Sequence, residues 1–508
     1  MQANQKDNIR IAKNSLMLYA RMFLMLVISL YTSRVILRVL GIVDYGIYNV
    51  VSGIVTMFTF VMGMLVATTQ RYISYYLGKG DGAMLNKIWS VCMNIHILFA
   101  ILILVAAETI GVWFFMNKMV IPEERMIAAM WVYHLSIIST MISIISIPYN
   151  ATIVAHESMG AFATLSIVET ILKLLIVFAL YFLPFDKLIV YSILLLLVSA
   201  SMRFFYASYC KRNYEETHYH YYNDIPLAKE LLSFVGWNIF GSMSGAMNTQ
   251  GLNILLNMFF GPVINAARGV AVQVQGVVTQ FAGNFQMALN PQIIKTYAAG
   301  EMEEMHSLVF RSTKFSFVLL FVLCLPIIIE SHWILDKWLG IIPEYTETFL
   351  RIILCITILD SMANPLVTSA TATGRIKKYQ IIVGGIYLLV LPVAYMVLKA
   401  GGCPWTVFVV YFIGCVVAFM VRLIIVKQMI KLSVREYFRK SILPCLLIIC
   451  LSIPIPIFLH RTLGDGTFNS IINIVISILL VAISSFLVGL TKSERRFVMN
   501  EGVKLLRK

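Results

Sequence analysis

The chain has 508 residues, of which 59% are hydrophobic and 13% charged, and its mean hydropathy is +0.84. Soluble domains are about 45–50% apolar and about 25% charged, so this composition excludes a soluble enzyme, a disordered chain and a fibrous repeat. The net charge is +15, but Lys and Arg lie between apolar runs and not in nucleic-acid-binding motifs, so we assign them to membrane orientation and expect no nucleic-acid partner.

Apolar runs of membrane-spanning length follow one another along the whole chain. The first run is too long for a signal peptide and lacks a small-residue cleavage pattern, so we expect it to remain in the protein. The sequence predicts an all-α polytopic membrane protein with about fourteen transmembrane helices. They lie at 15–32, 47–68, 88–112, 126–147, 162–183, 188–209, 231–260, 263–289, 315–329, 349–370, 381–398, 407–426, 442–459 and 471–490.

Most of the 40 Lys and Arg residues, Arg422 among them, fall on the side of the N-terminus when these helices alternate in direction. Because cytoplasmic loops carry the excess of positive charge, both termini are expected in the cytoplasm. The eight cysteines form no CxxC pair and lie mostly inside apolar runs, so we expect small buried hydrophobes and neither disulfides nor a metal site.

The longest connection, 211–228, is charged and rich in tyrosine, and it separates two groups of six helices. It predicts a cytoplasmic linker between six-helix bundles at 1–210 and 229–430, followed by two further helices and a basic tail at 431–508. His218 and His220 in this linker are interpreted as solvated and not as metal ligands.

The two halves share a faint internal similarity. At an offset of 220, Gly80 and Asp81 align with Gly300 and Glu301, and at an offset of 217, Pro148 aligns with Pro365. Since six helices return the chain to its starting side, this pattern predicts a parallel repeat about an axis along the membrane normal, which is typical of transporters.

Four arginines are candidates for binding an anion. Arg21 lies inside the first span, where a charge costs about 2.5–3.5 kcal/mol unless it faces water or an anionic ligand. Arg34 and Arg38 share one face near the outer end of that helix, and Arg268 opens the eighth helix at the corresponding place. The planar guanidinium suits a phosphate, because it can form paired hydrogen bonds. The alternatives are snorkelling to the headgroups for Arg21, and interfacial anchoring with Asp44 for Arg34 and Arg38.

The seventh and eighth helices are rich in amides, which are costly in lipid and should face a cavity or another helix. We expect them to line a cavity suited to hydroxylated sugars, and helix–helix hydrogen bonding is the alternative. The cavity candidates are Asn248, Asn253, Asn257, Gln273, Gln280 and Asn284.

Three further charged residues lie within spans. Asp360 precedes Asn364-Pro365, where the proline interrupts the helix ladder, so Asp360 is a candidate for coupling to H⁺ or Na⁺, or a satisfied acid at a kink. Glu169 and Lys173 are four residues apart, which favours a structural ion pair over a coupling role. We find no catalytic arrangement and no cofactor motif, so we do not expect an enzyme.

The stretch LYARMFLMLVISLYTSRVILRVLGIVDYGIYNVVSGIV, followed by ATTQRYISYYLGKGD, resembles bacterial polysaccharide (O-antigen type) flippases of the MOP exporter superfamily, which also contains the MATE exporters. The stretches FFGPVINAARGVAVQVQG, NPQIIKTYAAGE and TSATATGRIKKYQ resemble the same family, and the similarity extends over the whole chain.

The resemblance implies two MATE-like bundles around a central cavity, in the bacterial cytoplasmic membrane. The implied substrate is an undecaprenyl-diphosphate-linked oligosaccharide, and the residues carried over are Arg21, Arg34 and Arg268. The protein is expected to be a monomer. Its expected partners are membrane lipids, a polysaccharide polymerase and glycosyltransferases. The alternatives are a cation-coupled MATE-type small-molecule exporter, a lipid II flippase, and a membrane subunit or enzyme of glycan synthesis.

Overall fold

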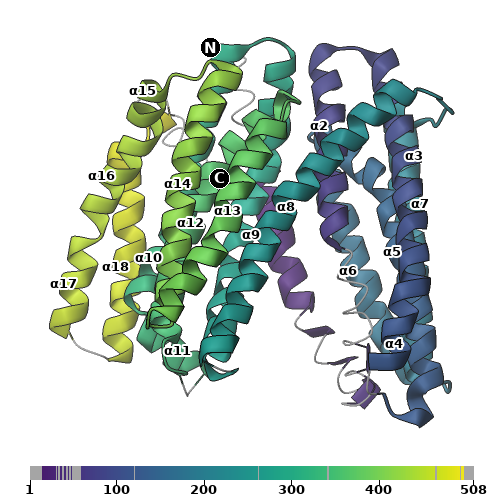
Figure 1. The fold of residues 1–508 in the computed structure, drawn as a ribbon, viewed down its shortest axis with the longest axis horizontal. Coiled ribbons are helices and arrows are strands. Elements are labelled where there is room, and N and C mark those ends of the chain that lie inside the picture. Colours follow the sequence, from purple (N-terminus) through teal and green to yellow (C-terminus); the bar gives the residue numbers. More distant parts are fainter. Residues whose placement is uncertain are drawn as a thin grey trace, which may run out of the picture. The chain divides into compact units, whose positions relative to one another are not determined.

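The computed structural model describes residues 14–29, 31–32, 35–36, 39–41, 44, 47–48, 59–118, 121–260, 262–339, 342–463, 466–491 and 494–496. In these ranges all regular structure is helical and no strand occurs. The chain divides into two compact units, Met1–Ile239 and Phe240–Lys508, and the division falls inside the long helix α8. The expected all-α polytopic fold is thereby confirmed (Figure 1).

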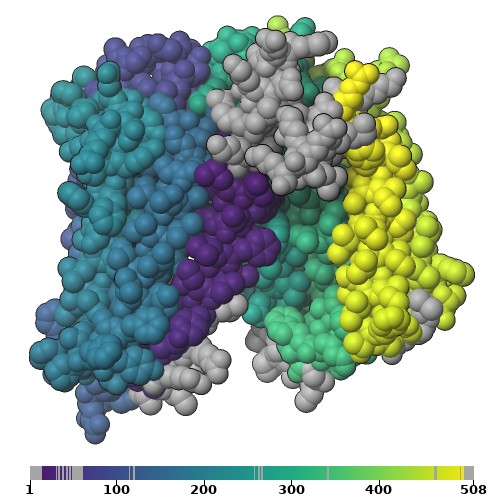
Figure 2. Space-filling view, turned by 180° about the vertical axis from the view of Figure 1, so that it is seen from behind, coloured from purple at the N-terminus to yellow at the C-terminus, as the bar shows by residue number. Residues whose placement is uncertain are grey.

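Unit 1 begins with the helix Asn14–Ser29, shown in purple in Figure 2. Leu16, Phe23 and Val27 of this helix are exposed, whereas Leu18 is buried. The elements that follow are α2 (Thr59–Lys79), α3 (Gly82–Ala106), η1 (Ala107–Gly111), α4 (Val112–Lys118), η2 (Glu123–Arg125), α5 (Met126–Ala155), α6 (Met159–Phe182), α7 (Lys187–Asn213) and η3 (Glu215–Thr217).

Unit 2 begins within α8 (Ile225–Phe260), which carries most of the amides of the seventh predicted span. The elements that follow are α9 (Pro262–Ala298), α10 (Met302–Ile329), α11 (Ser331–Leu339), α12 (Thr346–Ala372), α13 (Lys377–Lys399), α14 (Thr406–Ile430), α15 (Val434–Tyr437), η4 (Phe438–Ile442), α16 (Leu443–Ser452), α17 (Pro454–Leu463), α18 (Thr467–Ser484) and η5 (Ser485–Gly489).

Ten helices in the described part of the chain are long and apolar enough to cross a membrane. The other predicted spans correspond to the short helix Asn14–Ser29, to α2, and to the amide-rich α8 and α9. Residues 49–58 of the predicted segment 47–68 lie outside the described residues. The multi-pass architecture is therefore established, and the number fourteen stays a prediction.

The same turn joins α2 to α3 and α9 to α10. Gly80 and Gly300 have φ of 71° and 79°, a left-handed conformation that side chains with a Cβ disfavour. Each glycine donates its N–H to the backbone carbonyl of the residue three positions earlier. The acidic residue after it, Asp81 or Glu301, donates its N–H to the carbonyl of the residue five positions earlier. These are the hydrogen bonds of a Schellman motif, in which glycine is the usual residue. The offset of 220 thus relates two locally equivalent turns.

The offset of 217 also relates equivalent structures. Pro148 lies inside α5 and Pro365 inside α12, and each leaves a carbonyl that the helix ladder does not satisfy in the normal way. Thr152 donates its hydroxyl to the carbonyl of Pro148, and Ser369 does the same to that of Pro365. Both hydroxyl residues are four positions after the proline, so the repeat extends to this local hydrogen bond. The carbonyl that each proline frees lies four residues before it.

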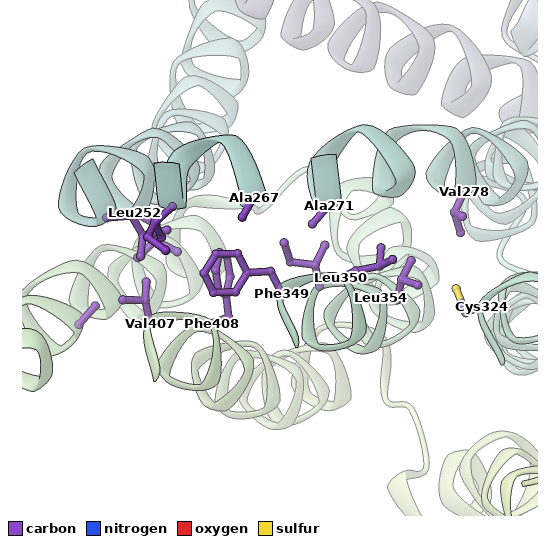
Figure 3. Close-up of a cluster of buried hydrophobic side chains, with 14 of the residues drawn as sticks. Leu252, Ala267, Ala271, Val278, Cys324, Phe349, Leu350, Leu354, Val407 and Phe408 are labelled. Atoms are coloured by element: carbon purple, nitrogen blue, oxygen red, sulfur yellow. The ribbon is translucent and has the colours of Figure 1, made fainter. Parts of the chain in front are cut away.

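The apolar core of unit 2 includes buried side chains of α8, α9, α12, α13 and α14 (Figure 3). Phe349 of α12 and Phe408 of α14 face each other with their ring centroids 4.8 Å apart, and both are buried. Ala267 and Ala271 of α9 lie on the opposite side of this cluster, where their small side chains allow close helix packing. This core packs together the five helices that carry the polar residues described below.

The C-terminal helix α18 packs on α10 and α16 through a stripe of small and polar side chains. The buried residues of this stripe are Ser470, Asn473, Ser477, Val481 and Ser484. Small residues permit close backbone approach in membrane helices, which explains why α18 docks here. Figure 2 shows these last helices, in yellow, forming an outer face of unit 2.

Candidate functional site

Three helices of unit 2 bring Asp360, Tyr387 and Arg422 together in the interior. The Tyr387 hydroxyl of α13 donates to Asp360 Oδ1 of α12 at 3.3 Å. Arg422 of α14 donates from Nη2 to the same hydroxyl at 3.0 Å. The tyrosine therefore bridges a carboxylate and a guanidinium across three helices, which offsets the cost of placing each charge within a span.

Arg422 was assigned from the sequence to the cytoplasmic boundary, but its side chain is only 8% exposed and lies eight residues before the end of α14. Its guanidinium lies 5.5 Å from the centroid of the Tyr387 ring. The missed signal is that an acid inside a span, Asp360, requires a cation on a neighbouring helix. Sequence position alone does not say which of the nearby basic residues supplies it.

Arg268 of α9 is buried against α8 at the other end of this polar interior. Its Nη1 donates to Asn253 Oδ1 at 3.1 Å, and its Nη2 donates to the carbonyl of Thr249 at 2.8 Å. Both acceptors are neutral, and no Asp or Glu of the described chain forms an ion pair with Arg268. The buried Nε has no hydrogen-bond partner. Arg268 therefore retains its positive charge and unused donors, which an anion could accept.

Tyr411 of α14 lies between these two groups. Its hydroxyl interacts electrostatically with Arg268 and with Asp360, and its ring centroid is 6.3 Å from that of Tyr387. Hydrogen bonds join Asp360, Tyr387 and Arg422, and Tyr411 and Arg268 lie near them. We call these five residues the unit 2 row. It passes through α9, α12, α13 and α14.

The amide candidates occupy different environments. Asn248 is fully buried and donates to the carbonyl of Tyr387 at 2.8 Å, which holds α8 on α13. Asn284 is buried, whereas Gln273 and Gln280 are exposed on α9. Asn253 accepts from Arg268. The side chain of Asn257 lies outside the described residues.

In unit 1 the predicted Arg21 lies against α6. Its Nη1 donates to Ser166 Oγ at 3.2 Å, and its guanidinium lies 4.6 Å from the centroid of the Phe162 ring. Tyr206 of α7 interacts electrostatically with Arg21 and with Glu169. Arg21 and Glu169, predicted separately, therefore lie around one tyrosine, and we call these residues the unit 1 cluster.

Glu169 and Lys173 form an ion pair of 2.6 Å on α6, with 36% and 48% of their side chains exposed. The spacing of four residues produced this pair as the sequence predicted. Arg34 and Arg38 lie outside the described residues, so the structure gives no position for them.

The predicted linker begins within α7 and continues along unit 1. Asn86 of α3 donates to the carbonyls of Glu216 and His218 at 3.0 and 2.8 Å. Lys87 pairs with Asp224 at 2.6 Å, and the His220 N–H donates to Ser90 Oγ at 3.2 Å. The segment is thus held on the end of α3 by its backbone.

The surroundings of Asp360 bear on whether a cation could bind at its carboxylate. No group of three His, Cys, Asp or Glu side chains comes together among the described residues. Na⁺ requires several oxygen ligands, but the carboxylate of Asp360 faces a tyrosine bridged to a guanidinium. Arg422 therefore supplies the positive charge that a bound cation would otherwise bring. Chemically, the site can bind an anion or exchange a proton at Asp360.

Comparison of the sequence with protein families and with curated proteins finds no match. Solved structures do match. One is a multidrug resistance MATE family transporter of the MOP superfamily in an outward-facing conformation, with a TM-score of 0.71 at 12% identity, covering 83% of this chain and 95% of the other. The chain has the MATE fold.

Two further structures support this assignment. A variant of the Vibrio cholerae MATE transporter VcmN has a TM-score of 0.68 at 15% identity and covers 85% of this chain and 100% of its own. A MOP superfamily transporter from Pyrococcus furiosus has a TM-score of 0.68 at 13% identity, covering 83% and 95%. These neighbours are transporters and not enzymes. At such low identity the similarity establishes the fold and leaves the substrate open.

Proposed function

We propose that this chain is a flippase that moves undecaprenyl-diphosphate-linked oligosaccharide repeat units across the bacterial cytoplasmic membrane by alternating access. The product would serve surface polysaccharide assembly, together with a polymerase and glycosyltransferases. In this proposal the guanidinium groups of Arg268 and Arg21 bind the diphosphate, and the amides of α8 and α9 bind the sugars.

The observation that carries the proposal is the balance of charge in the membrane interior. Glu169 is paired with Lys173, and Asp360 is bridged to Arg422. Arg268 has only neutral partners in the described chain, so its positive charge is not compensated. An uncompensated cation favours an anionic substrate, whereas an exporter of cationic drugs needs an uncompensated acid.

The MATE-type exporter and the lipid II flippase remain the alternatives. In the Pyrococcus furiosus neighbour, the reverse polarity of the binding pocket suggests a different function for that transporter. For this chain we use the charge of the interior in the same way. It supports an anionic substrate here, but it does not distinguish an oligosaccharide carrier from lipid II, since both carry a diphosphate.

For coupling we propose H⁺ and not Na⁺. Asp360 is half-buried and reaches the Tyr387 hydroxyl, so protonation would break its electrostatic link to Arg422 and loosen α12 from α13 and α14. The Tyr387 hydroxyl beside Asp360 is shared with the Arg422 guanidinium, and this positive charge disfavours Na⁺ at that carboxylate. Transport driven by an imposed pH gradient, and unaffected by a sodium gradient, is the expected behaviour.

The test is transport by the purified full-length protein in proteoliposomes. Fluorescent undecaprenyl-diphosphate glycans, lipid II and a cationic dye are offered separately, and outward movement of each is followed. We expect protein-dependent flipping of the glycan carrier. Export of the dye with no flipping would contradict the proposal, and flipping of lipid II alone would assign the second alternative.

A further inference from the structure

A groove lies between α6 and α7 of unit 1, apart from the unit 1 cluster. Its volume is about 560 Å³, within the range of about 300–1,000 Å³ typical of ligand sites. Leu165 and Val168 of α6 form one wall, and Phe204 and Phe205 of α7 form the other. The groove ends in polar residues, with Tyr209 and Arg212 among them.

The position of these residues along α7 fits one leaflet of a bilayer. Eight residues separate Phe204 from Arg212, which is about 12 Å of helix at 1.5 Å per residue. Half of the hydrocarbon core is about 15 Å thick. The groove therefore extends from the end of α7, where Arg212 is exposed, inward through most of one leaflet.

The face that carries the groove is apolar over the rest of the membrane depth. On α7 the exposed side chains Ile193 and Leu197 continue the line of Phe204. On α6 the exposed side chains of Ile171 and Leu175 continue the line of Val168. An apolar face of this length is suited to hydrocarbon, so we place the groove against lipid chains and not in an aqueous cavity.

The groove carries a positive charge at the end of α7, whereas the rest of its lining is uncharged. Lys211 and Arg212 end α7 and are both exposed, but only Arg212 lines the groove. Basic residues at the cytoplasmic ends of spans attract anionic lipids, and each contributes about 1 kcal/mol near the surface. A guanidinium also forms paired hydrogen bonds with a phosphate.

We propose that this groove binds an acidic glycerophospholipid of the cytoplasmic leaflet. Its phosphate contacts Arg212, and one acyl chain packs between Leu165 and Val168 on one side and Phe204 on the other. The site is independent of the flippase proposal, because it requires only that α6 and α7 span the membrane with the end of α7 on the cytoplasmic side.

The test is native mass spectrometry of the delipidated full-length protein, titrated with phosphatidylglycerol or phosphatidylethanolamine of identical acyl chains. The wild type should prefer phosphatidylglycerol. Arg212→Gln should weaken that binding about tenfold, the size of one charge-assisted hydrogen bond. Lys211→Gln is the matched control, since it removes the same charge from the same helix end outside the groove, and it should bind as the wild type does.

A second variant tests the apolar part. Val168→Trp fills the groove and should weaken both lipids, with an unchanged thermal unfolding midpoint showing that the fold is kept. Equal losses in Arg212→Gln and Lys211→Gln would overturn the proposal, as would unchanged binding in Val168→Trp. Displacement of phosphatidylglycerol by glycerol phosphate, or preferential binding of undecaprenyl phosphate, would also overturn it, because the occupant would then be a free phosphate or a polyprenyl carrier.

Discussion

Arg268 and Arg422 are equally buried arginines of unit 2 with different neighbours. Arg422 shares a tyrosine hydroxyl with a carboxylate, whereas Arg268 donates to an amide oxygen and a backbone carbonyl. The neutral partners leave Arg268 as the charge available to a ligand. Arg422 is committed to structure in the same helix bundle.

Arg268→Gln should reduce flipping of the diphosphate-linked glycan about 10- to 100-fold, because one charge-assisted contact contributes about 1.5–3 kcal/mol. Arg268→Lys should retain more activity, since the charge remains. The measurement is initial flipping rate in proteoliposomes at matched protein content. Arg351→Gln is the control, because it removes the same charge from a residue that pairs with Glu347 at the exposed end of α12. Equal rates in all three variants would remove Arg268 from the binding site.

Arg422→Gln should lower the free energy of unfolding by about 1.5–3 kcal/mol, because Asp360 then remains charged without a nearby cation. Adding Asp360→Asn should recover part of this loss, since an amide does not need that cation. Thermal unfolding of the single and double variants in detergent measures the coupling. Additive losses in the double variant would show that the two residues do not interact through Tyr387.

Among the elements, α18 is attached to α10 at both ends. At one end Glu330, which follows α10, accepts from Asn473 at 2.6 Å and contacts His460 at 3.0 Å. At the other end Glu494, which follows η5, pairs with Lys314 of α10 at 2.8 Å. The buried serines lie between these contacts. The polar contacts at the two ends thus fix the position of α18 along the axis of α10, which a uniform apolar surface would not do.

The Glu494 contact should be sensitive to acid. Burial raises the pKa of Glu494 and Lys314 lowers it, and the net direction is below the ordinary value of 4.5. Because the pKa is lower in the folded state, the stabilisation is present above about pH 4.5 and is lost as the pH falls through the folded value. Wild type and Glu494→Gln should therefore differ in unfolding midpoint at pH 7 and converge at strongly acidic pH. A pH-independent difference would refute the electrostatic explanation.

The glycine turns provide a second test at this scale. Gly300→Ala should lower the free energy of unfolding by about 1–2 kcal/mol, since a Cβ disfavours the left-handed conformation. Gly236→Ala is the matched control, because this glycine lies inside α8 and its added Cβ would meet nothing within 4 Å. That variant should be neutral or stabilising. Destabilisation by both variants to the same degree would exclude the backbone explanation.

At the scale of the molecule, the two units repeat one plan. The helix Asn14–Ser29 packs on α6 through Arg21, and α8 packs on α13 through Asn248, so the first helix of each unit contacts the fifth. The turns at Gly80 and Gly300 and the kinks at Pro148 and Pro365 fall at equivalent helices. The sequence similarity between the halves thus corresponds to equivalent local structures within each unit, and the parallel arrangement of the halves stays a prediction.

The orientation of this plan in the membrane can be tested with a native cysteine. Cys403 is exposed between α13 and α14, in a loop that the positive-inside rule places outside the cytoplasm. A membrane-impermeant maleimide should label intact cells at Cys403 and not label the Cys403→Ser variant. With Cys403→Ser as background, His218→Cys in the linker should react only after permeabilisation. Labelling in the reverse order would invert the proposed topology.

The sequence by itself determined the all-α polytopic fold, the order of the helices and the repeat between the halves, because apolar length, glycine and proline act locally along the chain. It also determined the Glu169–Lys173 ion pair, since side chains four positions apart lie next to each other on any α-helix. It did not determine that Arg422 joins Asp360, or that Arg268 lacks an acidic partner. Those facts depend on which helices pack together, and residues 62 positions apart along the chain meet only when α12, α13 and α14 pack around Tyr387.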